Sequence, residues 1–223
     1  MPHLPTARLY CILDLGYITE QNAEKVTLSL LNGGADLLQL RAKNHDLATI
    51  ERVARRLLPL CRAAGIPFIL NDHPALAASI GADGVHLGQD DGSLAEARAL
   101  VNSTLRIPQS AFLYGRSTHS LAQARAALAE GFDYIGFGPL FPTPTKAGRP
   151  AIGLHEIAAM EREIGEKNPA FCIGGITPET LPTVLAAGAR RVVVVSALLQ
   201  APDIQAATRT ILAELDSAHR ESP

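Results

Sequence analysis

Apolar and polar positions along the chain form two kinds of segment that follow each other eight times. Short apolar runs have the length and composition of buried strands, and Ala/Leu-rich amphipathic stretches ending near glycine separate them. The predicted strands are Leu9–Leu13, Leu37–Leu40, Pro67–Leu70, Gly84–Leu87, Ala111–Tyr114, Tyr134–Phe137, Ala170–Ile173 and Val192–Val195. The predicted helices are roughly Asn22–Leu31, Leu47–Ala64, Pro74–Ile80, Leu94–Val101, Leu121–Glu130, Leu154–Ile164, Pro178–Ala187 and Asp203–Leu215.

Strands that alternate with helices and are apolar on both faces indicate a parallel sheet covered by helices. Eight such units fit a closed (β/α)8 TIM barrel, whereas a doubly wound open sheet needs only five or six. No linker-like stretch divides the sequence. We therefore predict a single TIM-barrel domain, an α/β fold over residues 1–223, with flexible ends at 1–8 and 217–223.

Composition and charge exclude several classes of partner. With 20 Lys+Arg against 22 Asp+Glu and no Trp, the chain lacks the basic surface and the aromatic platforms of nucleic-acid binders. No apolar run approaches the roughly 20 residues that span a bilayer. The cysteines Cys11, Cys61 and Cys172 are scattered in apolar contexts, as reduced core thiols are. We expect a cytoplasmic protein that binds neither nucleic acid nor membrane, and the sequence leaves a homo-oligomeric state open.

In a barrel of this kind, functional residues lie at the carboxyl ends of the strands. After the second predicted strand, period-2 alternation places Gln39, Arg41 and Lys43 on one face if the strand extends that far. Two cations and an amide suit a bound polyanion. The alternative is that Arg41 pairs with a core acid and Lys43 is a solvated loop charge.

Acidic residues follow the next two strands. Asn71-Asp72 follows the third predicted strand, and Asp90-Asp91 follows the fourth. Neighbouring parallel strands are about 5 Å apart, so acids at their ends can share a divalent ion. Mg²⁺ commonly takes one or two carboxylates together with water and phosphate oxygens. These acids could instead form turns or cap helices, as the Asp91-Gly92 pair weakly suggests, but the neighbouring cations favour the metal.

Polar residues also follow the later strands. Ser117 or His119, after the fifth strand, could bond a substrate or move a proton, although a lone histidine there is more often structural. The Pro-rich loop after the sixth strand carries Thr143, Thr145 and Lys146, which are donors suited to phosphate, unless the loop is only a rigid crossover.

Small residues complete the set of strand ends. Gly174-Gly175 follows the seventh strand and Ser196 follows the eighth, where barrels of this type cradle a phosphate with backbone N–H groups. Together, the strand ends indicate two anion-binding zones at one mouth. We therefore expect two phosphorylated ligands, one of them with a metal-bound pyrophosphate.

Six collinear motifs now show a family resemblance. They are Gln39-x-Arg41-x-Lys43, Asn71-Asp72, the run 82–91 (ADGVHLGQDD), Gly115-x-Ser117-x-His119, Gly136-Phe137-Gly138-Pro139 with Thr143-x-Thr145-Lys146, and Ile173-Gly174-Gly175-Ile176. The sequence from about Leu9 to Leu199 resembles the thiamine phosphate synthase family. The resemblance implies a transferase of thiamine biosynthesis that condenses hydroxymethylpyrimidine pyrophosphate with a thiazole phosphate, giving thiamine phosphate and pyrophosphate.

The same resemblance implies a role for each matched residue. Gln39, Arg41, Lys43 and Asn71 hold the pyrimidine pyrophosphate, Asp72 and Asp91 hold Mg²⁺, Ser117 and Lys146 contact the pyrophosphate, and Thr143, Thr145, Gly175 and Ser196 bind the thiazole phosphate. Arg41, Lys43, Ser117 and Lys146 are accordingly the expected catalytic residues. Mg²⁺ and the cations Arg41, Lys43 and Lys146 would stabilise the negative charge on the departing pyrophosphate. The aminopyrimidine would support a cationic methylene group, which the thiazole nitrogen then captures.

Two features complicate the match. Arg191 stands where the family usually has a small residue, which is consistent with packing at the bottom of the barrel. The Gly115–Ser120 motif also resembles the related thiazole tautomerases, in which the histidine, here His119, transfers a proton. That sister family typically lacks both the acid pair and the Gln-x-Arg-x-Lys strand. A non-catalytic sensor of phosphorylated ligands is a third hypothesis, but it would have little use for the acid pair.

Overall fold

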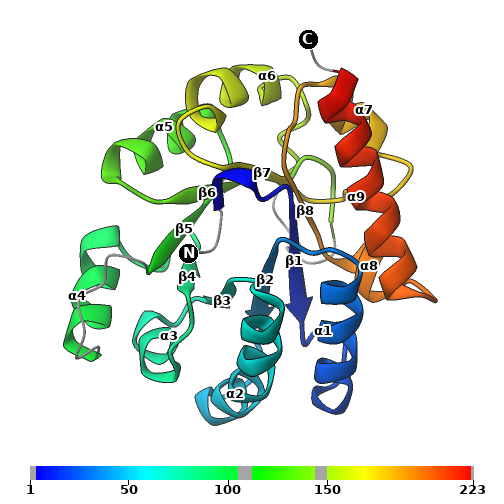
Figure 1. Ribbon diagram of the computed structural model, residues 1–223. Helices are drawn as coiled ribbons and strands as arrows, with labels where there is room; N and C mark the ends of the chain where they lie inside the picture. The colour runs from blue at the N-terminus through cyan, green and yellow to red at the C-terminus, as the bar shows by residue number, and fades with distance from the viewer. Residues whose placement is uncertain (1–3, 105–111, 144–149, 222–223) are drawn as a thin grey trace.

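Eight parallel strands close into a barrel in the computed structural model, which describes residues 4–104, 112–143 and 150–221 (Figure 1). Each strand pairs with its neighbours in sequence order, and β1 pairs with β8 to close the sheet. The strands are β1 (Leu9–Asp14), β2 (Leu37–Arg41), β3 (Phe68–Asn71), β4 (Gly84–Leu87), β5 (Leu113–Thr118), β6 (Tyr134–Phe137), β7 (Ala170–Ile173) and β8 (Val192–Val194). The predicted (β/α)8 barrel is confirmed.

Helices surround the barrel on its outside, as Figure 1 shows. They are α1 (Ala23–Asn32), α2 (Leu47–Ala64), α3 (Pro74–Ile80), α4 (Leu94–Thr104), α5 (Leu121–Glu130), α6 (Ile157–Met160), α7 (Leu181–Ala186), α8 (Ser196–Leu199) and α9 (Ile204–Glu221), with short turns η1 (Leu4–Thr6), η2 (Glu20–Asn22) and the π-helical η4 (Glu161–Gly165). The helix predicted over Leu154–Ile164 is thus divided between α6 and η4. The four-residue α8 was not predicted, because a single turn leaves no periodic pattern to detect.

Side chains fill both faces of the sheet, which explains why the strands read as continuous apolar runs. An outer set packs between strands and helices, and an inner set fills the barrel: Leu4, Ala7, Tyr10, Ile12, Leu37, Ile69, Tyr134, Phe171 and Val193. Two members of the inner set, Leu4 and Ala7, come from the segment before β1, which we expected to be a flexible end. Residues 217–221, at the other expected flexible end, lie in α9.

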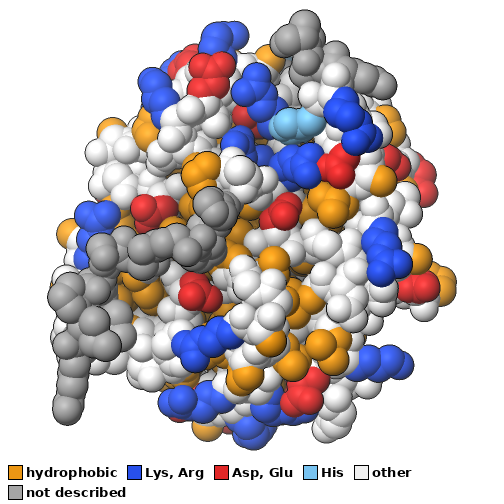
Figure 2. Space-filling model, viewed as in Figure 1, with side chains coloured by type: hydrophobic (Ala, Val, Ile, Leu, Met, Phe, Trp, Pro, Cys, Tyr) orange, Lys and Arg blue, Asp and Glu red, His pale blue; other side chains and the backbone are white. Residues whose placement is uncertain are grey.

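Arg191, the residue that departs from the family pattern, joins parts of the chain at the amino-terminal end of the barrel. Its Nη2 donates to the carbonyl of Pro5 at 3.0 Å and its Nη1 to that of Gly165 at 3.4 Å. Figure 2 shows Lys and Arg side chains gathered around a histidine on this side of the molecule. The long side chain therefore ties the segment before β1 to the connection leading into β7.

Glu161 in η4 provides a test of stability against pH. The residue is 4% exposed, Oε1 accepts from the Arg190 N–H at 3.0 Å, and Oε2 has no hydrogen-bond partner within the described ranges. Burial raises the pKa of Glu161 above its ordinary value of about 4.5. The folded state therefore favours the protonated acid, and stability is lost as the pH rises through the pKa of the folded state. Glu161→Gln keeps the acceptor but removes this titration.

We compare the melting temperature of Glu161→Gln with that of the unaltered protein at each pH. This difference should shift in favour of the variant by a few degrees from pH 5 to pH 8, since a change of about 1 kcal/mol in the free energy of unfolding corresponds to roughly 2–4 °C for a protein of this size. Thermal denaturation followed by circular dichroism measures the difference. Glu163→Gln is the matched control: the hydrogen bond from Arg125 holds the pKa of Glu163 below its ordinary value of about 4.5, so this acid stays ionised above pH 5 and the relative melting temperature of the variant should be constant between pH 5 and pH 8. A pH-independent difference for Glu161→Gln would contradict this account.

Candidate active site

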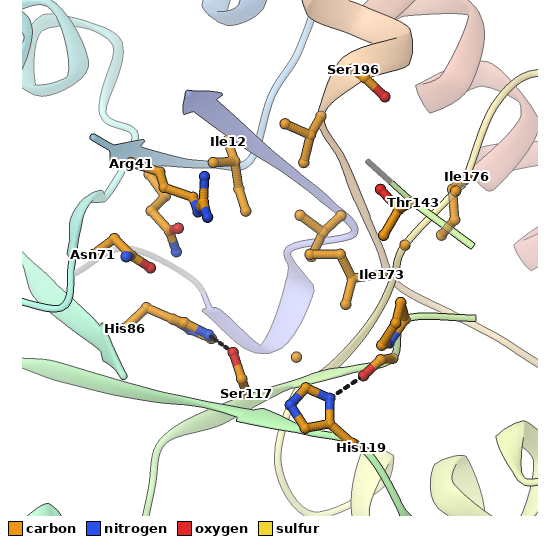
Figure 3. A pocket seen from close by; sticks show the side chains of 18 residues that line it. Ile12, Arg41, Asn71, His86, Ser117, His119, Thr143, Ile173, Ile176 and Ser196 are labelled. Carbon is orange, nitrogen blue, oxygen red and sulfur yellow. Dashed lines mark hydrogen bonds between the residues drawn. The ribbon is translucent and has the colours of Figure 1, made fainter. Parts of the chain in front are cut away.

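A pocket opens at the carboxyl end of the barrel, where the strand-end residues converge (Figure 3). It is lined by Gln39, Arg41, Asn71, Ser117, Thr143, Gly175 and Ser196 among the residues predicted from the sequence. Lys43, Asp72 and Asp91 lie beside the pocket rather than in its lining. Thr145 and Lys146 lie outside the described residues. The pocket thus brings together predicted residues that are far apart in the sequence, such as Gln39 and Ser196, which are 157 positions apart.

Arg41, the last residue of β2, is held by an acid that the sequence analysis did not single out. Its Nη1 donates to Oδ2 of Asp14 at 2.5 Å, and the two side chains are only 14% and 3% exposed. Oδ1 of Asp14 accepts from the N–H of Gly16 at 2.9 Å, which fixes the carboxylate. Arg41 therefore both pairs with a core acid and lines the pocket, so the two interpretations offered for it hold together. A polar residue at the end of an apolar strand was the signal that could have identified Asp14.

Asp72 and Asp91 bring two carboxylates into contact beside Arg41. They are within hydrogen-bonding reach of each other, and burial followed by the proximity of Asp91 raises the pKa of Asp72 to about 6. Burial acts to raise the pKa of Asp91 too, but hydrogen bonds from Asp72 and the Gly88 N–H hold it below its ordinary value. Lys43, with its side chain 50% exposed, places Nζ 3.6 Å from Oδ2 of Asp72. The structure therefore places side by side the two acids that were predicted to share a metal ion, while the metal itself stays a prediction.

The backbone around these acids is unusual. Asp72 has a φ of 67°, in the left-handed region that costs a non-glycine residue about 1 kcal/mol or more. Its N–H donates to the carbonyl of His86 at 2.9 Å, which holds the turn after β3 in place. The strained turn directs the Asp72 carboxylate toward Asp91.

The loop that carries Asp91 is attached to β5. Nε2 of Gln89 donates to the Ser117 carbonyl at 2.5 Å, and Nη1 of Arg116 donates to the Gly92 carbonyl at 2.6 Å. Oδ2 of Asp91 itself accepts from the Gly88 N–H at 2.6 Å. These contacts fix the position of the second carboxylate relative to Ser117.

The residues present fit a Mg²⁺ ion whose coordination is completed by substrate. Among the described residues, no group of three or more His, Cys, Asp or Glu side chains could hold a metal. Two touching carboxylates, one of which takes a proton readily, are the donor set that Mg²⁺ uses when phosphate oxygens and water provide the remaining ligands. Asp72 and Asp91 are the residues that would hold it.

Glycines shape the opposite side of the pocket. Gly174 and Gly175 have φ values of 100° and 68°, and a Cβ on Gly175 would lie 2.6 Å from Cβ of Phe141. The N–H groups of Leu140 and Phe141 donate to the carbonyls of Ile173 and Gly174, at 2.8 and 3.1 Å. The glycines therefore let the loop after β6 pack against the turn after β7, which places Thr143 beside Ile176 in the pocket lining (Figure 3).

Two histidines line the pocket. His86, on β4, is 8% exposed and its Nε2 lies 3.0 Å from Oγ of Ser117, so it is a buried histidine next to the site. His119 hydrogen-bonds through Nδ1 to the carbonyl of Gly138, and its N–H donates to Oε1 of Gln123 at 2.7 Å. These hydrogen bonds fix the position of His119, whose side chain also lines the pocket.

Comparison with known proteins assigns the chain to a family. A family model described as thiamine monophosphate synthase matches residues 9–198. The chain belongs to the thiamine monophosphate synthase family. A thiamine-phosphate synthase of Thermus thermophilus is 45% identical over 206 residues, covering 92% of this chain and 95% of its own length. One from Bordetella avium is 45% identical over 186 residues, covering 81% and 82% of the two chains.

A solved structure agrees with the family assignment. Thiamine phosphate pyrophosphorylase from Pyrococcus furiosus superposes with a TM-score of 0.82 at 28% identity, over 95% of this chain and 96% of its own. The synthase activity predicted from the sequence is therefore confirmed at the level of the family. Among the residues that the structure describes, no helix combines the length and apolar character needed to cross a membrane.

Proposed function

We propose that the pocket condenses hydroxymethylpyrimidine pyrophosphate with a thiazole phosphate to give thiamine phosphate and pyrophosphate, using the residues assembled at the strand ends. The observation that carries this assignment is the acid pair Asp72–Asp91 next to Arg41 and Lys43. Acids and cations in contact at one mouth suit a pyrophosphate that arrives with a divalent metal and leaves as an anion.

At the pyrimidine end, Gln39 and Asn71 would hold the ring and its substituents, while Arg41, Lys43 and Ser117 would contact the pyrophosphate; Lys146 is assigned there too by family resemblance. The bond between the methylene carbon and the pyrophosphate oxygen breaks, and its electron pair leaves with the oxygen. A bound Mg²⁺, held by Asp72 and Asp91, would supply neutralisation of the charge on that leaving group. Arg41 and Lys43 would add positive charge at the same point.

At the thiazole end, the thiazole nitrogen donates its lone pair to the methylene carbon, forming the new carbon–nitrogen bond. This step needs no proton transfer, so the chain requires no general base. Thr143, Gly175 and Ser196, which all line the pocket, would bind the thiazole phosphate together with Thr145. The apolar side chains of Ile12, Ile173 and Val193 in the same wall would exclude water from the cation.

The test is an assay of pyrophosphate release by the purified protein with both substrates and Mg²⁺. Release of pyrophosphate should require both substrates, and His119→Gln should retain most of this activity.

The alternative activity, thiazole tautomerisation, is favoured by one observation, the position of His119 in the pocket wall. It predicts metal-independent isomerisation of the thiazole phosphate that His119→Gln abolishes. Binding of thiamine phosphate without turnover of either kind would instead indicate a sensor.

The cysteines bear on the cellular compartment in which the protein works. All three cysteines, Cys11, Cys61 and Cys172, are buried and free, and burial raises the pKa of each thiol. Buried free thiols fit the reducing cytoplasm, where we expect this enzyme to work, alone or as a homo-oligomer.

A further inference from the structure

A chain of hydrogen bonds joins three residues of the pocket lining, Gln39, His86 and Ser117, through two tyrosines in the barrel interior. Nε2 of Gln39 donates to Oη of Tyr10 at 2.5 Å, and the hydroxyls of Tyr10 and Tyr134 are 3.1 Å apart. Oη of Tyr134 lies 3.3 Å from Nδ1 of His86, and Nε2 of His86 lies 3.0 Å from Oγ of Ser117. Figure 3 shows the last link, from His86 to Ser117. We call these five side chains the relay.

The relay is enclosed by the barrel interior. Tyr10 is 1% and Tyr134 0% exposed, and their rings meet edge to face with centroids 5.8 Å apart. A Cβ on Gly115 would overlap the Tyr134 ring, so the glycine in β5 makes room for that ring. Burial raises the pKa of both phenols, so each keeps its proton and can donate. The relay is thus a fixed set of polar groups in an otherwise apolar core.

The hydrogen bond from Gln39 to Tyr10 determines which group donates and which accepts in each of the following hydrogen bonds. The amide nitrogen of Gln39 can only donate, so the Tyr10 oxygen accepts and the Tyr10 hydrogen is available to Tyr134. Tyr134 can then donate its own hydrogen to Nδ1 of His86. A neutral histidine that accepts at Nδ1 carries its hydrogen on Nε2 and donates to Oγ of Ser117. The hydroxyl hydrogen of Ser117 is thereby directed away from His86.

We propose that Tyr10 and Tyr134 are positioning residues that act through His86 to keep Ser117 a hydrogen-bond donor toward the phosphorylated pyrimidine substrate. The identity of that ligand rests on the proposed function. With the opposite direction, Nε2 of His86 would accept from Ser117, which would then present a lone pair to an anionic phosphate. That contact is repulsive, so the direction of the relay decides whether Ser117 attracts or repels the substrate.

Tyr134→Phe tests the proposal because it removes one oxygen and keeps the ring. We expect kcat/KM for the pyrimidine substrate to fall about tenfold, as the loss of a buried hydrogen bond implies, with the KM for thiazole phosphate unchanged. Tyr10→Phe should have a similar effect. The double variant should be no worse than about the stronger single variant, because the residues act in series, whereas independent effects would multiply to about a hundredfold.

The tautomer of His86 is a second measurement that a purely structural role would not change. In ¹⁵N NMR spectra of the full chain, neutral His86 should carry its proton on Nε2, and Tyr134→Phe should shift the signals toward a mixture of tautomers. His86→Gln assigns those signals by their disappearance. Tyr114→Phe is the matched control, since Tyr114 packs against Phe112 in the outer core rather than in the relay, and it should change neither tautomer nor kinetics.

Unchanged kinetics in a folded Tyr134→Phe protein, multiplicative effects in the double variant, or an unaltered His86 tautomer would each overturn the proposal. A chain that released no pyrophosphate at all would refute the proposed function instead. In that case the tautomer measurement still decides whether the relay sets the direction of the His86 hydrogen bonds.

Discussion

Asp91→Asn will lower the rate of pyrophosphate release by about two to three orders of magnitude at saturating Mg²⁺. The substitution keeps the size of the side chain and an oxygen for the Gly88 N–H, but it removes one of the two charges that would hold the ion. The departing pyrophosphate then loses the charge neutralisation on which the reaction depends. Steady-state release of pyrophosphate measures the effect, and Asp72→Asn should give a loss of similar size.

A binding measurement separates this effect from damage to the fold. Adding Mg²⁺ with inorganic pyrophosphate should raise the melting temperature of the unaltered protein and leave that of either Asn variant almost unchanged. Asp90→Asn is the matched control, because Asp90 is the exposed acid next to Asp91 in the same loop. Full activity in a folded Asp91→Asn protein, or an equal loss in Asp90→Asn, would show that the metal is held elsewhere.

Asp14→Asn will lower kcat/KM for the pyrimidine substrate by roughly ten- to a hundredfold, although Asp14 itself is placed to touch Arg41 rather than the substrate. The variant keeps an acceptor for Gly16 but leaves the buried Arg41 guanidinium without its charged partner. An arginine that is no longer fixed meets the pyrophosphate in fewer productive orientations. Steady-state kinetics at varied pyrimidine concentration measure the loss, which should appear mainly in this substrate's KM.

Asp36→Asn provides the matched control for the loss of a core acid. Oδ2 of Asp36 accepts from the N–H groups of Arg8 and Leu9, at 2.8 and 2.9 Å, at the other end of β1. This variant should lose stability without a change in kcat/KM. Equal kinetic losses in both variants would mean that Asp14 acts only through the stability of the barrel.

The fold followed from the sequence because every strand is covered on both faces. Burial of both faces made the strands continuous apolar runs, and eight repeats of one unit left few other architectures. Boundaries were harder to predict where tertiary contacts decide them. The helix before β7 changes to a π-helical turn at Glu161, where the acid side chain is buried against the Arg190 N–H. No periodicity of apolar residues encodes that change.

Much of the site also followed from the strand ends, since side chains at the carboxyl ends of parallel strands meet at one mouth. Alternation correctly placed Gln39 and Arg41 in the pocket, but β2 ends at Arg41, so Lys43 lies beyond the strand and contacts Asp72 instead. The roles of these residues remain predictions from family resemblance and chemistry.

The relay was not visible in the sequence. Tyr10 and Tyr134 are 124 positions apart and look like ordinary apolar members of their strands. Their hydroxyls meet only because the barrel closes and Gly115 leaves space for one ring. A local pattern carries no signal of such a contact across the barrel.

The most direct test of the central claim is to quantify thiamine phosphate and pyrophosphate in one reaction of the purified protein with both substrates, with Mg²⁺ and with a chelator in its place. We predict that the two products form in equal amounts with Mg²⁺ and that both are lost with the chelator. Pyrophosphate without thiamine phosphate, or neither product with Mg²⁺ present, would contradict the assignment of this pocket as the site of condensation.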